Sequence, residues 1–92
     1  MSGARRAVQF LAAAAPVDLS PALGNPERDQ VYILTPGAAA TVCTINEGGA
    51  GGVLALTLSA PANGPSVVTP PIRIQNPHLA ALTAGATLNV LE

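Results

Sequence analysis

The feature that most constrains the fold is the stretch from Val31 to Ser59, which contains three runs of β-branched and aliphatic residues. A Pro36-Gly37 turn separates the first run from the second, and the glycine-rich tract 48–52 separates the second from the third. Short apolar runs between turn signals are typical of antiparallel strands joined by hairpins. The stretch therefore predicts a β-meander in the middle of the chain.

Alternation within these runs predicts which side chains face the core. The third run, 53–59, has the strongest period of two, which places Leu54, Leu56 and Leu58 on one face and predicts a core built on them. The first run is apolar on both faces, so we expect a central strand or one covered by a partner. It contains Tyr32, whose hydroxyl we expect at a rim or an interface.

The remainder of the chain predicts shorter elements. Residues 17–19 alternate and favour a short edge strand, residues 71–76 favour a strand, residues 79–82 favour one helical turn, and residues 86–91 favour a final strand. Close turn signals and five to eight short strands are typical of an all-β fold, a small antiparallel β-sandwich or barrel.

The first 15 residues have few features of a folded element. They hold a basic pair and a run of alanines, and Pro16 ends any helix that begins there. We expect an extended N-terminal arm over 1–15, with Val8 and Phe10 on one side and Gln9 and Leu11 on the other, followed by a single β domain over 16–92. A short helix over residues 7–15 is the alternative. No apolar stretch approaches the roughly 20 residues of a membrane-spanning helix.

Composition excludes several function classes. Only 10% of the 92 residues are charged, the net charge is −1, lysine is absent and the arginines are scattered apart from one pair, so no basic patch for nucleic acid exists. Much of the apolar content is alanine, which buries little surface. The single Cys43 excludes an intrachain disulfide and a cysteine zinc cluster. A core with little apolar area and without a disulfide or zinc cluster predicts that contacts with neighbouring molecules stabilise the fold.

No group of residues indicates catalysis. His78 has no nucleophile or carboxylate at motif spacing, so we expect a surface or cap residue rather than a catalytic base. Asp18, Glu27 and Asp29 do not match the spacing of a calcium loop. The glycine tract lacks the lysine and hydroxyl of a phosphate-binding loop and predicts a hairpin tip. Cys43 is expected as a buried apolar residue. We therefore expect no enzyme, no catalytic residues, no cofactor and no metal.

The proline-rich loop 60–71 indicates a rigid contact region instead. Its prolines restrict the backbone and lower the entropy cost of ordering the loop against a partner. We expect contacts from this loop, from the N-terminal arm and from the first strand of the meander. The predicted contact residues are Val8, Phe10, Leu11, Tyr32, Val67, Val68, Pro70 and Pro71.

Four features occur together in this chain: an alanine-rich start, the strand pair V-Y-I-L-T-P-G-A-A-A-T-V, a glycine-tipped hairpin and the ending G-A-T-L-N-V-L-E. In these features the chain resembles small virion structural proteins of tailed bacteriophages, such as capsid decoration or cement proteins and head-fibre bases. The resemblance implies a homo-oligomer, trimeric or capsomer-linked, on the outside of a phage head. It implies the major capsid protein or another virion protein as partner, and it includes no motif that assigns a role to any residue.

We therefore expect a non-enzymatic virion protein that decorates and stabilises a phage capsid and binds neither nucleic acid nor membrane. A tail, neck or baseplate component is the alternative. A secreted carbohydrate-binding or adhesive β domain is a third hypothesis. Such a domain would be expected to carry aromatic platforms, and this chain has only Phe10 and Tyr32.

Overall fold

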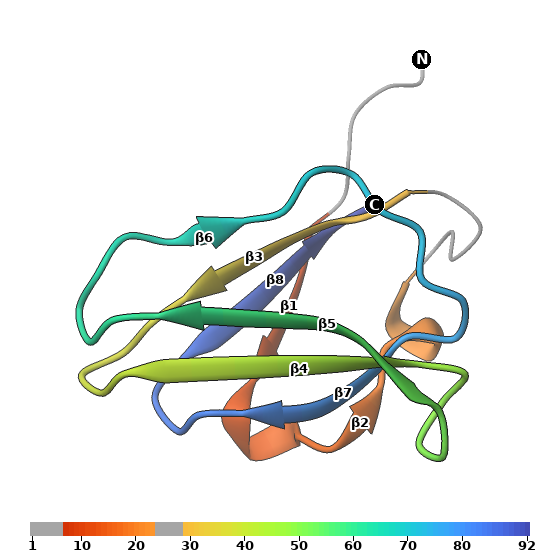
Figure 1. Cartoon of the computed structure of the whole chain (residues 1–92), viewed down its shortest axis with the longest axis horizontal. Coiled ribbons are helices and arrows are strands. Elements are labelled where there is room, and N and C mark those ends of the chain that lie inside the picture. Colours follow the sequence, from red (N-terminus) through yellow and green to blue (C-terminus); the bar gives the residue numbers. More distant parts are fainter. Residues whose placement is uncertain (1–6, 24–28) are drawn as a thin grey trace.

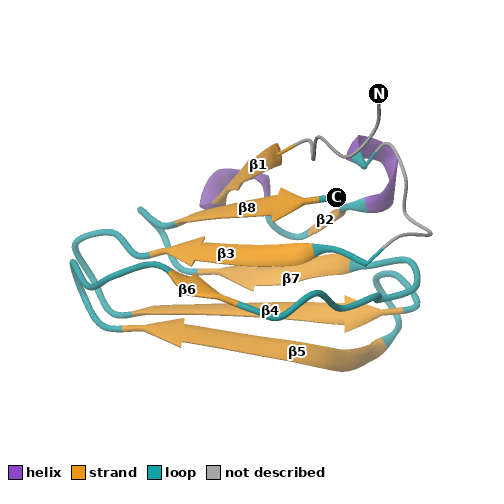
Figure 2. Ribbon diagram, turned by 90° about the horizontal axis from the view of Figure 1, so that it is seen from above, coloured by secondary structure: helices purple, strands orange, loops and turns teal. Residues whose placement is uncertain are grey.

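The chain folds into two four-stranded antiparallel sheets that pack into a β-sandwich, in a computed structural model that describes residues 7–23 and 29–92 (Figure 1). The all-β prediction is confirmed. The strands are β1 (Ala7–Leu11), β2 (Val17–Asp18), β3 (Val31–Thr35), β4 (Thr41–Glu47), β5 (Val53–Ala60), β6 (Val67–Val68), β7 (His78–Leu82) and β8 (Thr87–Leu91). Two short 3-10 turns, η1 (Ala12–Ala14) and η2 (Ser20–Ala22), lie beside β1 and β2 (Figure 2).

The strand order combines segments that are far apart in the sequence. The first sheet, here called sheet A, has the order β1-β8-β3-β6, and the second, sheet B, has the order β2-β7-β4-β5. The predicted β-meander is wrong, because β3 belongs to sheet A whereas β4 and β5 form a hairpin in sheet B. The prediction that the first run forms a central strand is confirmed, since β3 pairs with β8 on one side and β6 on the other.

Cross-strand rows of apolar side chains form the core between the sheets. In sheet A, Leu88 pairs in register with Phe10 on one side and with Leu34 on the other, and all three are buried. In sheet B, Ile45 pairs with Leu79 and is also fully buried. Alternate residues along each strand face this core, so the burial pattern of β3 and β8 has a period of two.

The prediction that three leucines of β5 form the core is wrong for one of them. Leu58 is buried at 7% exposure and Leu56 is half-buried against the core, whereas Leu54 is 58% exposed. The reason is a bulge in the β4–β5 ladder, where Ile45 pairs with Leu56 but the next residue, Asn46, pairs with Leu54. The extra residue reverses the side-chain alternation. Leu54 therefore lies on the outer face of sheet B.

The segment after the proline loop also differs from its prediction. Residues 71–76 make only an isolated bridge, between Ile72 and Gln30, and the strand β7 forms over residues for which a helical turn was expected. β7 lies between β2 and β4 and pairs with both. These two ladders satisfy the backbone groups of a sequence that has little intrinsic preference for a strand. Ile74, in this segment, is buried in the core.

The described part of the predicted N-terminal arm packs on the body of the sandwich. Ala7–Leu11 forms β1 at the edge of sheet A, paired with β8 along its whole length. Phe10 and Leu11 lie on opposite sides, as predicted, with Phe10 facing the core and Leu11 facing outward. The first six residues of the predicted arm lie outside the described residues. Residues 7–11 are thus an extended segment and also a structural element of the sheet.

Candidate functional site

The predicted contact residues occupy two different environments. The prediction that Phe10 and Tyr32 contact a partner is wrong, because their side chains are 7% and 0% exposed and belong to the core of the single chain. Val8 and Val67 are half-buried against the same core. The other four predicted contact residues are exposed: Leu11, Val68, Pro70 and Pro71. Burial of the two aromatic rings follows from their large apolar area in a chain with few bulky side chains.

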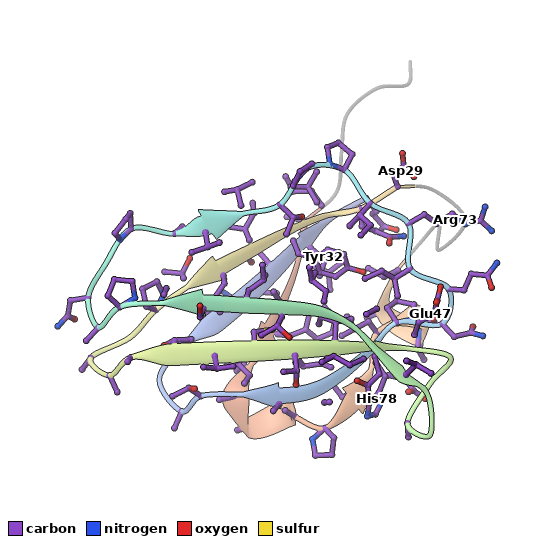
Figure 3. All side chains as sticks on the ribbon, in the orientation of Figure 1. Asp29, Tyr32, Glu47, Arg73 and His78 are labelled. Carbon is purple, nitrogen blue, oxygen red and sulfur yellow. The ribbon has the colours of Figure 1, made fainter. Side chains whose placement is uncertain are left out.

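Tyr32 joins β3 to the proline loop rather than reaching a rim. Its backbone N–H donates to Thr69 Oγ1 at 3.0 Å, and the N–H of Thr69 donates to the Tyr32 carbonyl at 3.0 Å. The hydroxyl donates to Gln30 Oε1 at 3.4 Å, within the protein. Figure 3 shows Tyr32 toward the middle of the molecule. Burial, followed by the nearby Cys43 thiolate charge, raises the pKa of Tyr32 to about 12.

Alkaline conditions are expected to destabilise the fold through two buried groups. Burial raises the pKa of Cys43 from 9.0 to about 11, and the pKa of Tyr32 is raised from 10.0. Both groups ionise more readily in the unfolded chain, so the free energy of unfolding should be constant up to about pH 9 and should fall as the pH rises toward about 12. Urea unfolding midpoints measured across this range test the expectation.

The variant Cys43→Ala separates the two titrations. It should shift the pH at which the free energy of unfolding begins to fall from about 9 to about 10, where the tyrosine of the unfolded chain begins to ionise. A wild-type midpoint that does not change up to pH 12 would contradict the burial of both groups.

The outer face of sheet A carries no charged side chain among the described residues. Leu11 at one edge and Val68 at the other belong to this same face, because Leu11 pairs with Thr87 and Val68 pairs with Ile33. They are 52% and 59% exposed. We call this surface the uncharged face. Its ten residues are Ala7, Gln9, Leu11, Val31, Ile33, Thr35, Val68, Thr87, Asn89 and Leu91.

Charged side chains of the described part lie elsewhere. Figure 3 shows Asp29, Glu47 and Arg73 together at one end of the sandwich, on the right. All of the residues in the uncharged face are aliphatic or neutral polar. A four-stranded surface of this composition can be covered by a partner with no cost for removing charges from water. It is therefore a candidate interaction surface of the described chain.

His78 is placed differently from its prediction. It was expected at the surface or at a cap, but it is the first residue of β7 and is 7% exposed. Its Nδ1 lies 2.7 Å from Asp18 Oδ1, which links β7 to the short strand β2. Pairing with β2 and β4 on both sides explains the burial. A partly buried hydrogen bond of this kind positions the two strands and brings no nucleophile to the histidine.

A pocket of about 250 Å³ lies beside Asp18, but its lining is poor in reactive groups. The hydroxyl of Ser20 is buried and finds no partner among the described residues. Because this oxygen is inaccessible to solvent, it cannot contact a molecule in the pocket without movement of the chain. Within the described ranges, no three His, Cys, Asp or Glu residues gather at a distance suited to a metal ion. The pocket is lined by Asp18, Ser20, Pro21, Gly48, Gly49 and Asn76.

The glycine tract forms the tip of the β4–β5 hairpin, as predicted. Gly48 and Gly49 have φ angles of 92° and 86°, which residues with a side chain rarely adopt. Their N–H groups donate to the carbonyls of Gln75 and Asn76, at 3.0 Å each. The tip is therefore attached to the segment before β7. These amides are used within the fold and do not form a phosphate cradle.

Comparison of the chain with protein-family models, with curated proteins and with solved structures finds no match. Among the described residues, no helix has the length and apolar character needed to cross a membrane. The surface of the protein is therefore the basis for inferring its function.

Proposed function

We propose that this protein is a non-enzymatic structural component of a virion, and that it decorates and stabilises the capsid of a tailed bacteriophage. The observation that supports the proposal best is the uncharged face of sheet A. Soluble monomers usually carry charge over about a quarter of their residues, and this chain has 10%. A neutral outer face on a small sandwich is typical of a protein whose surface is covered by neighbours.

The two exposed ends of this face explain how one surface could hold the protein on a shell. Leu11 and Val68 lie on the outermost strands, β1 and β6, with the threonine and asparagine side chains of β8 between them. The neutral polar groups supply hydrogen bonds, and the aliphatic groups supply apolar contact. Pro70 and Pro71 are exposed after β6 and extend the rigid margin of the contact.

The proposal is tested by measuring occupancy on virions of the phage that encodes the chain. The variant Leu11→Lys/Val68→Lys should reduce occupancy on separated heads by about tenfold or more, because it brings two cations into an apolar contact. Val42→Lys is the matched control. Val42 is an aliphatic residue that is 46% exposed on the outer face of the opposite sheet, so its replacement should leave occupancy unchanged.

Circular dichroism and thermal unfolding must show that both variants keep the fold. Equal occupancy for the wild type and both variants would overturn the assignment of the uncharged face. Protein found on tails and not on heads would replace capsid decoration with the tail, neck or baseplate role. Absence of the protein from purified virions would overturn the proposed function altogether.

A further inference from the structure

β5 is an edge strand whose outward backbone groups have no partner in the described chain. It lies at the end of the order β2-β7-β4-β5 and forms its only ladder with β4. Outside the strand ladders, no backbone hydrogen bond of the described residues involves any of the residues 53–60. The N–H and C=O groups that point away from β4 are therefore available to another strand.

The other three edge strands of the sandwich are shorter than β5. β2 and β6 contain only two residues each, and Asp18 or flanking prolines limit further pairing there. β1 has five residues, AVQFL, three fewer than β5. β5 has eight residues, V-L-A-L-T-L-S-A, with no charge and no proline. Natural proteins usually protect a long edge strand with charged residues or proline, so an edge strand without them indicates a pairing site.

We propose that β5 pairs antiparallel with β5 of a second copy of this chain, so that two B sheets join into one eight-stranded sheet. The bulge near Ala55 separates the start of β5 from its regular part, 56–60. Pairing along the whole regular part places Leu58 on the two-fold axis. Thr57 then lies opposite Ser59 of the second copy.

The composition of β5 favours a second copy as the occupant. A two-fold axis places identical strands opposite each other, so any charged residue on β5 would lie close to its own copy. β5 has none. Thr57 and Ser59 are exposed and can form neutral cross-strand contacts, while Leu58 faces the core of its own sandwich at 7% exposure. The pairing thus adds backbone hydrogen bonds without burying a charge.

The proposed function supplies one premise of this pairing, namely that the chain assembles. The proposed function and the proposed pairing use different surfaces of the molecule. The particle contact uses the outer face of sheet A, whereas the contact between copies uses the edge of sheet B. Each contact can therefore be removed separately.

The test compares two double variants by sedimentation velocity over a wide range of protein concentration. Thr57→Lys/Ser59→Lys sets lysines opposite lysines across the axis and should raise the dimer dissociation constant by about tenfold or more. The matched control is Val42→Lys/Thr44→Lys. These residues are the register partners of Ser59 and Thr57 on β4, so the same charges lie on the same face, one strand inward. Across the axis they are about 14 Å apart, beyond the screening length of about 8 Å.

We expect a reversible dimer for the wild type and the control and a folded monomer for the edge variant. Hydrogen exchange of the unmodified protein gives an independent measurement, in which peptides covering residues 53–60 should gain protection as concentration rises. A wild type that remains monomeric throughout would overturn the pairing. An equal loss of dimer in the control would assign the contact to the face of sheet B and would also overturn it.

Occupancy of the edge variant on virions separates the two proposals. If the pairing is absent but occupancy depends on the uncharged face, only the contact between copies is wrong. If dimers form through β5 and virions do not contain the protein, only the proposed function is wrong.

Discussion

Replacing Leu88 with alanine is expected to lower the free energy of unfolding by about 2–5 kcal/mol, the range for truncating a buried leucine. Leu88 is fully buried on β8, in register with Phe10 on one neighbouring strand and Leu34 on the other. Its removal leaves a cavity at the centre of sheet A that rigid strands on both sides cannot close. Because small domains are stable by only about 5–15 kcal/mol, the variant should lose a large part of its stability.

Urea unfolding followed by circular dichroism and by the fluorescence of Tyr32 measures this loss. Leu11→Ala is the matched control, since it removes the same atoms from the neighbouring strand at a position that is 52% exposed. Its effect should remain within about 0.5 kcal/mol. Equal losses in the two variants would contradict the assignment of Leu88 to the core and of Leu11 to the outer face.

Deleting residues 1–11 is expected to destabilise the chain by more than the loss of one aromatic side chain, which alone costs about 3–5 kcal/mol. The deletion removes Phe10 from the core and the whole of β1 from the edge of sheet A. β8 then becomes an edge strand with unpaired backbone groups and an exposed apolar margin. We expect a loss of cooperative unfolding or a marked shift of the urea midpoint.

Deletion of residues 1–6 provides the comparison, because it retains β1 and Phe10. This shorter deletion should keep the cooperative transition. A chain without residues 1–11 that unfolds at the same urea concentration as the full chain would show that β1 contributes nothing to the sandwich.

Local patterns predicted the elements that alternate strongly between faces. The runs that became β3, β4, β5 and β8 were recognised because their sheets bury one face, which imposes a period of two on the sequence. The short strand at Val17 followed from the same signal, whereas which side of β1 faces the core did not. The pattern also predicted the glycine-tipped hairpin, because positive φ angles at Gly48 and Gly49 require residues without a side chain.

Where the pattern was wrong, contacts from distant parts of the chain decided the outcome. Leu54 continues the alternation of β5, but a bulge against β4 turns it outward. Residues 78–82 favour no strand, yet β4 and β2 pair with them from both sides. His78 is buried as a result of that pairing, which its neighbours in the sequence do not indicate.

The amino-acid sequence was enough to predict the class of this protein, which is a small all-β domain, poor in charge, without a disulfide, a basic patch or a catalytic motif. These properties depend on composition and on side-chain alternation, which are local. The division of the strands between two sheets, the burial of both aromatic rings and the open edge at β5 became visible only in the fold. Each of these outcomes depends on pairing between strands that are distant in the chain, such as β1 with β8, and backbone hydrogen bonds of this kind leave no periodic signal in either strand.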